Sequence, residues 1–237
     1  MMRRILIGAA LASLVVGALA LPASASAGMT IGATGGNGAA ECPPDYTWAQ
    51  DSSAAGSPAY AVPAGGGVIT SWSTDRGPAL ATAQVRLKVF QRTAPNTYLT
   101  VGQSDFETLA APGVNTFATR VEVQGGDILG FRMTAAPISC RRSGSTGDLA
   151  VASGPVQPDP PIGSSVSFGT VGAFLLNLAA TVEPDADHDG FGDETQDQCP
   201  TNAATQGPCP VRKKKCKHRK RHKSSAVITK KCKNKHH

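Results

Sequence analysis

The chain has 237 residues, 41% of them hydrophobic, which is enough for one full domain with appendages. Its formal net charge of +6 conceals three different regions: residues 28–182 carry ten acids and eight bases, residues 183–197 seven acids and no base, and residues 212–237 thirteen bases and no acid. All five histidines lie outside residues 28–182, which excludes a Ser-His-Asp or Cys-His catalytic arrangement built from that region alone. The charge steps near residues 183 and 210 predict boundaries.

The first 27 residues have the pattern of a secretory signal peptide. Two arginines precede an apolar stretch, 5–21, and Ala25-Ser26-Ala27 forms a small-residue cleavage site, so the mature chain is expected to begin near Gly28. An uncleaved membrane anchor is the alternative, because 17 mostly apolar residues approach spanning length, but Pro22 favours cleavage. No transmembrane segment is predicted after signal removal. We therefore expect a secreted or cell-wall-associated protein in an oxidising space, where its six cysteines pair.

Residues 28–40 are predicted to be a flexible N-terminal segment, and residues 41–182 a β-rich domain. Gly, Pro, Ser, Thr and Ala are abundant in the domain, and its apolar residues form short alternating runs without a helical period. The expected strands cover 67–73, 85–89, 98–102, 119–123, 128–133 and 173–182, with a turn at 124–127. This pattern is typical of an all-β fold and favours a jelly-roll-like antiparallel β-sandwich. Cys42 and Cys140 bracket most of the runs, so we expect them to pair.

The β-rich domain offers residues for two further functions. Asp105 and Glu107 are the nearest carboxylate pair for glycoside hydrolysis, but residues two apart on a strand lie about 7 Å apart on one face and are usually solvated. We predict that the protein is not an enzyme. A secreted carbohydrate-binding module is the second alternative, because aromatic rings stack on sugar faces. The aromatic residues considered for this role are Trp48, Trp72, Tyr46, Tyr60 and Tyr98, of which Trp72 is predicted to lie in the core.

The acidic segment after residue 182 spaces its carboxylates regularly. Counting from Asp185, aspartates occupy positions 1, 3, 5 and 9, Gly190 stands at position 6, and Phe191 at position 7 offers its backbone carbonyl. A hard cation with about six to eight oxygen ligands requires such a set in a tight loop. Gln196 at position 12 replaces the bidentate Glu of an EF-hand, and no amphipathic helix precedes the loop, which argues against an EF-hand. His188 at position 4 is predicted to point outward.

The residues Asp197-Gln198-Cys199-Pro200 follow this loop. Together with the spaced aspartates and the central glycine, this ending resembles the thrombospondin type 3 repeat. In that family such segments bind calcium, are stiffened by disulfides and link domains of secreted or adhesive proteins. The resemblance implies that residues 183–210 bind Ca²⁺ through these ligands: Asp185, Asp187, Asp189, Asp193 and the Phe191 carbonyl. Asp197 is predicted to complete the set.

Two alternatives stay open for this segment. Glu194 competes with Asp197 for the last place in the metal shell, because the family's next acid usually comes three residues after position 9, whereas Asp197 comes four after it and Glu194 one after it. A solvated acidic linker is the other alternative for the segment as a whole. Against the linker, seven like charges in fifteen residues repel one another unless a cation neutralises them.

Residues 211–237 form a basic tail that is predicted to be largely disordered. Sequential pairing of the remaining cysteines gives Cys199–Cys209 and Cys216–Cys232. The cationic run of the tail has no aromatic ring for base stacking, so no specific nucleic-acid partner is expected. Its charge favours an anionic cell-wall polymer or an acidic glycan, held by contacts that salt weakens. A merely solubilising tail and a zinc site of its cysteines and histidines are the alternatives.

Taken together, these features predict a non-enzymatic, calcium-binding structural or adhesion protein of the envelope or matrix. Its β-sandwich would project from a polycationic anchor through a calcium-stiffened hinge. The overall layout also resembles that of exported actinobacterial proteins, and this second resemblance implies no activity.

Overall fold

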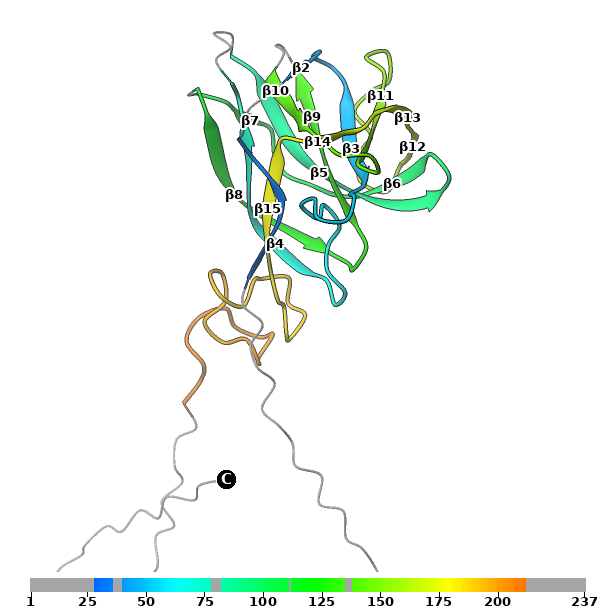
Figure 1. The fold of residues 1–237 in the computed structure, drawn as a ribbon. Coiled ribbons are helices and arrows are strands. Elements are labelled where there is room, and N and C mark those ends of the chain that lie inside the picture. The colour runs from blue at the N-terminus through cyan, green and yellow to red at the C-terminus, as the bar shows by residue number, and fades with distance from the viewer. Residues whose placement is uncertain (1–27, 36–39, 78–81, 111, 135–137, 212–237) are drawn as a thin grey trace, which may run out of the picture.

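The structure is a computed structural model that describes residues 28–35, 40–77, 82–110, 112–134 and 138–211. These residues form strands joined by turns and loops, with no helix among them. The all-β class and the antiparallel pairing predicted from the sequence are therefore confirmed (Figure 1). Within the same ranges, no helix has the length and apolarity needed to cross a membrane. The predicted signal peptide, 1–27, and the predicted Cys216–Cys232 pair lie outside the described residues.

The described chain forms fifteen strands. They are β1 (Met29–Ala33), β2 (Ala40–Cys42), β3 (Thr47–Ser52), β4 (Gly67–Asp75), β5 (Gln84–Ala94), β6 (Thr97–Gln103), β7 (Glu107–Thr108), β8 (Val114–Val123), β9 (Ile128–Thr134), β10 (Ile138–Ser143), β11 (Leu149–Ser153), β12 (Ser165–Ser167), β13 (Gly169–Gly172), β14 (Phe174–Leu176) and β15 (Leu178–Glu183). The predicted run 173–182 is split at Asn177, whose backbone N–H donates to the Cys140 carbonyl at 2.7 Å. Each of the other predicted runs lies within a strand.

The strands belong to three antiparallel sheets, which include a curled half-barrel (Figure 1). The four-stranded sheet has the order β1-β15-β4-β8, and the three-stranded sheet the order β14-β10-β2. The eight-stranded sheet runs β12-β6-β5-β9-β3-β11-β13, with β7 paired to β5. The predicted turn at 124–127 joins β8 to β9, and the Asp127 carboxylate caps it by accepting the Gln124 N–H at 2.8 Å.

Strands of the four-stranded and eight-stranded sheets share one hydrophobic core. Ile69 and Trp72 of β4 belong to the same buried cluster as Leu87 and Val89 of β5. Trp72 is only 1% exposed, and its ring centroid lies 4.9 Å from that of Phe117 on β8. The prediction that Trp72 is a core residue is therefore confirmed.

A disulfide between Cys42 and Cys140 joins β2 to β10, as predicted. The two Cα atoms are 5.6 Å apart, and both side chains are fully buried. The bridge spans 98 residues of sequence, and for a loop of that length the chain-entropy model gives about 4.7 kcal/mol of stabilisation. A second disulfide, Cys199–Cys209, was also predicted and lies beyond β15. Both bridges are consistent with an extracellular location.

The structure differs from the prediction at the N-terminal segment, 28–40, which was expected to be flexible. Met29–Ala33 forms β1, an edge strand that pairs along its whole length with β15. Ile31 is the only side chain of β1 that enters the core. The apolar residues Met29, Ile31 and Ala33 do alternate with Thr30 and Gly32, but the run is only five residues long and buries one side chain, so the strand depends on its pairing with β15.

A buried cation fixes the proline-rich loop 154–164 on β5. Lys88 is fully buried, and its Nζ lies 2.6 Å from each of three acceptors: Asp159 Oδ1, Gln103 Oε1 and the Pro160 carbonyl. Arg86 also contacts Asp159, with 3.3 Å between Nη1 and Oδ2. Burial lowers the pKa of Lys88, while the hydrogen bond and charge of Asp159 act in the opposite direction. Asp159 is therefore the counter-ion that makes burial of this lysine tolerable.

We predict that Asp159→Asn lowers the free energy of unfolding by about 2 kcal/mol, because it removes the charge-assisted bond to a buried ammonium. Urea unfolding measures this loss. The matched control is Asp105→Asn, which alters an exposed acid and should leave stability unchanged. Equal stability of the Asp159→Asn protein and the unmodified protein would contradict the assigned role.

Candidate metal centre

Glu183, the last residue of β15, connects the sheet to the acidic segment. The residue is 1% exposed, and its carboxylate accepts four hydrogen bonds: Oε1 from the hydroxyls of Thr70 (2.8 Å) and Thr195 (2.7 Å), and Oε2 from the N–H groups of Glu194 (3.0 Å) and Thr195 (2.9 Å). Burial alone would raise the pKa of Glu183, but these bonds hold the pKa below its usual value. One carboxylate thus ties β4, β15 and the far side of the acidic loop together.

The acidic segment also packs against β8, where the four-stranded sheet ends (Figure 1). Gln196 Nε2 donates to the Thr119 carbonyl at 2.8 Å. The guanidinium of Arg120 lies over the Phe191 ring, 4.1 Å from its centroid. Residues 183–197 are therefore docked on the β-domain, which differs from the projecting hinge expected from the sequence.

Two glycines allow this close approach. Gly190 has φ of 81°, and a Cβ at this position would lie 2.5 Å from Glu122 Oε1. A Cβ at Gly192 would lie 2.5 Å from both Glu183 Oε2 and Thr70 Cγ2. The sequence predicted the chain reversal at Gly190. It did not indicate why a glycine is needed at Gly192, because that need arises from the contact with Thr70 on β4.

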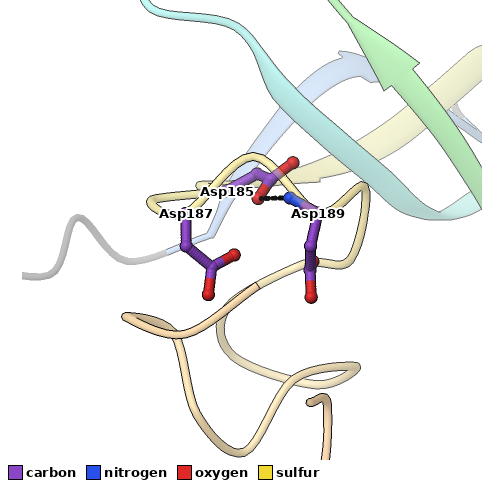
Figure 2. Close-up of side chains that lie close together, drawn as sticks. All are labelled: Asp185, Asp187 and Asp189. Atoms are coloured by element: carbon purple, nitrogen blue, oxygen red, sulfur yellow. Dashed lines mark hydrogen bonds between the residues drawn. The ribbon is translucent and has the colours of Figure 1, made fainter. Parts of the chain in front are cut away.

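Three carboxylates of the predicted set gather on one turn of the loop. Asp185, Asp187 and Asp189 each place a carboxylate oxygen within 4.8 Å of the other two (Figure 2). The loop orients Asp185 through its own backbone, because Oδ1 accepts the Asp189 N–H at 3.1 Å and Oδ2 accepts the Gly190 N–H at 3.0 Å. Such a cluster of half-buried carboxylates could hold a metal ion.

Two of the predicted ligands, one inside this cluster and one outside it, have buried oxygens that lack a hydrogen-bond donor among the described residues. These oxygens are Oδ1 and Oδ2 of Asp187 and Oδ2 of Asp197. Asp197 is 4% exposed as a residue, and its Oδ1 accepts the Cys199 N–H at 2.8 Å. Burial raises the pKa of Asp193, and the charges of Asp185, Asp187 and Asp197 raise it further. The site thus concentrates negative charge and leaves buried acceptors unsatisfied.

The remaining predicted residues occupy different positions around the loop. The Asp193 carboxylate accepts the Ala186 N–H, with 3.2 Å to each oxygen, and so links the two ends of the loop. Glu194, the alternative to Asp197, is exposed and accepts the Gly28 N–H at 2.6 Å instead of facing the cluster. His188 is exposed with φ of 58°, in agreement with the prediction that it points outward.

The Cys199–Cys209 loop folds back onto the acidic segment. Gln206 Nε2 donates to Asp189 Oδ2 at 2.8 Å, and the Gln198 N–H donates to the Gln206 carbonyl at 2.9 Å. The disulfide therefore supports one of the clustered aspartates through Gln206. The sequence indicates no role for Gln206, because a lone glutamine is uninformative. For Glu183 it indicates only the start of the acidic segment.

The residues named for the two alternative functions, sugar stacking and glycoside hydrolysis, lie elsewhere in the β-domain. None of the aromatic side chains considered for sugar stacking is exposed: Trp48, Tyr60, Trp72 and Tyr98 are buried, and Tyr46 packs against the core. Asp105 is exposed and Glu107 half-buried, and neither accepts a hydrogen bond from a side chain among the described residues.

Comparisons of the chain with protein-family models, with curated proteins and with solved structures find no match. The geometry of the loop is therefore the basis on which a function can be proposed.

Replacing Glu183 by Gln is expected to loosen the acidic segment, because a neutral amide has one acceptor oxygen for four donors. We predict a loss of about 2 kcal/mol in the free energy of unfolding and faster proteolysis within residues 185–198. Urea unfolding and limited proteolysis measure the two effects. The exposed Glu41→Gln is the control, and unchanged proteolysis of the Glu183→Gln protein would contradict the docking role.

Proposed function

We propose that residues 183–199 bind one Ca²⁺ ion and that the protein is a secreted, non-enzymatic structural or adhesion protein. The observation that carries this proposal is the convergence of three aspartates within 4.8 Å, together with buried oxygens of Asp187 and Asp197 that find no hydrogen-bond donor in the described part of the chain. Leaving such groups unsatisfied is costly, whereas a hard cation would satisfy several of them at once. An all-oxygen ligand set favours calcium over zinc or copper.

The proposed ligands are those suggested by the sequence: Asp185, Asp187, Asp189, the Phe191 carbonyl, Asp193 and Asp197. Asp197 is preferred to Glu194 because Asp197 is buried with a free oxygen, while Glu194 is exposed and bonded to Gly28. A single loop of this kind is expected to bind with a dissociation constant of about 10⁻⁴ to 10⁻³ M, as extracellular modules do.

The wider proposal concerns how the parts work together. We infer that the two larger sheets form a jelly-roll-like β-sandwich, since β4 and β5 contribute to one core. Calcium would strengthen the docked end of this domain, close to the point where the chain leaves it for the basic tail. The tail would hold the protein on an anionic cell-wall polymer or acidic glycan by charge. A carbohydrate-binding module is less well supported, because the aromatic side chains are not exposed.

The first prediction from this proposal concerns calcium binding. Calorimetric titration of the oxidised mature protein should give one saturable site, and Asp187→Asn combined with Asp189→Asn should abolish it by removing two charges from the cluster. The control Asp105→Asn should leave binding unchanged. An absence of binding at calcium concentrations up to about 10 mM, ten times the largest dissociation constant expected, would contradict the proposal.

A second prediction distinguishes the two candidates for the last ligand. Asp197→Asn should weaken calcium binding about tenfold or more, because it removes a buried oxyanion from the shell. Glu194→Gln should have a much smaller effect, since that side chain is directed at Gly28. The reverse order of the two effects would show that Glu194 is the ligand.

The basic tail gives a third prediction. The mature chain should bind an immobilised teichoic-type polymer, and a chain ending at Val211 should not, because thirteen basic residues are removed. Release should occur between about 0.1 and 1 M salt, as screening shortens the range of the attraction. A neutral polysaccharide is the control. Retention in high salt, with release only by denaturant, would contradict an electrostatic anchor.

A further inference from the structure

The backbone nitrogen of Gly28 lies against the acidic segment. It donates to Glu194 Oε1 at 2.6 Å. Pairing of Met29 with Val182 fixes its position, because it places Gly28 beside Glu183 at the end of β15. A Cβ at Gly28 would lie 3.1 Å from Glu194 Oε2 and 3.2 Å from Glu183 Cγ. The glycine therefore fits closely between these two acidic residues.

Gly28 is also the residue at which the mature chain is predicted to begin. Hydrolysis of the Ala27–Gly28 peptide bond consumes one water, leaves a carboxylate on Ala27 and frees the nitrogen of Gly28 as an amine. An α-amino group has a pKa of about 7.7–8.0 and so is mostly protonated at neutral pH. Cleavage would therefore convert a neutral amide donor into an ammonium at the position where it already contacts a carboxylate.

We propose that the α-ammonium of Gly28, created by removal of residues 1–27, forms an ion pair with Glu194 and thereby fastens the acidic segment to β1. The acidic segment contains seven acids and no base. None of the ion pairs among the described residues involves it. The new terminus supplies a cation to this segment from the opposite end of the domain sequence.

This ion pair acts next to Glu183. The backbone N–H of Glu194 donates to Glu183 Oε2, so the side chain and the backbone of one residue join β1 and β15 to the loop. Cleavage before Gly28 thus strengthens the attachment of the acidic segment to the sheet. The proposal rests on cleavage before Gly28 and does not depend on calcium binding.

The test is a double-mutant cycle on the oxidised mature chain in the presence of a chelator, which removes any contribution from calcium. A synthetic segment 28–41, with either a free or an acetylated amino terminus, is ligated to residues 42–237 at Cys42. Acetylation keeps an N–H donor on Gly28 and removes only the charge. Each form is prepared with Glu194 and with the Glu194→Gln substitution, and the folding equilibrium constant is measured by urea unfolding.

Acetylation should lower the folding equilibrium constant of the Glu194 protein about two- to five-fold, the range for a partly exposed ion pair. In the Glu194→Gln protein it should have no effect, and high salt should abolish the difference. An equal effect of acetylation in both proteins, or none in either, would overturn the proposal. N-terminal sequencing of the exported protein completes the test, because a terminus at any residue other than Gly28 would also overturn it.

Discussion

The organisation of the acidic segment depends on the hydrogen bonds that the buried carboxylate of Glu183 accepts. This carboxylate accepts hydrogen bonds from a strand residue, Thr70, and from the far side of the loop, at Glu194 and Thr195. A carboxylate at this depth is stable only if its lone pairs are satisfied, so the sheet and the loop must keep their relative positions. The loop is consequently presented by a rigid support rather than by a free linker.

This support explains why the loop can concentrate negative charge. Free in solution, seven acids in fifteen residues would extend the chain. Glu183 and Gln196 hold the segment at the sheet, and Gln206 holds Asp189 from the other side. Repulsion among the aspartates is then opposed by fixed contacts. Burial is the main cause of the raised pKa of Asp193, and the charges of the neighbouring aspartates add to it. A bound cation would relieve the repulsion, which links charge, docking and metal affinity in one physical account.

The sequence predicted those features that depend on local order. Alternation in 85–89 and 98–102 identified β5 and β6, because a half-buried strand has a period of two residues, but it gave no sign that Lys88 on β5 is buried. The spacing of the aspartates predicted their convergence, since a tight loop that wraps around a cation brings alternate side chains together. The positions of the cysteines along the chain predicted both disulfides that the described residues contain.

Features that depend on distant residues could not be predicted in this way. Thr70 and Glu183 are separated by 113 residues, and no local pattern relates them. β1 contains one core side chain, Ile31, and exists because β15 offers it an edge. The choice between Asp197 and Glu194 was open because both acids follow the loop, and only the fold directs one of them toward Gly28.

Amide hydrogen exchange of the mature protein, recorded with and without calcium, tests both the docking of the acidic segment on the sheet and the metal site within it. We predict that the Glu194 and Thr195 amides are protected even without calcium, because Glu183 already accepts hydrogen bonds from them. Calcium should then add protection at the Asp189, Gly190 and Phe191 amides, which lie around the aspartate cluster. Free-chain exchange rates throughout residues 185–197 without calcium, and no change on adding it, would contradict both the docking and the metal site.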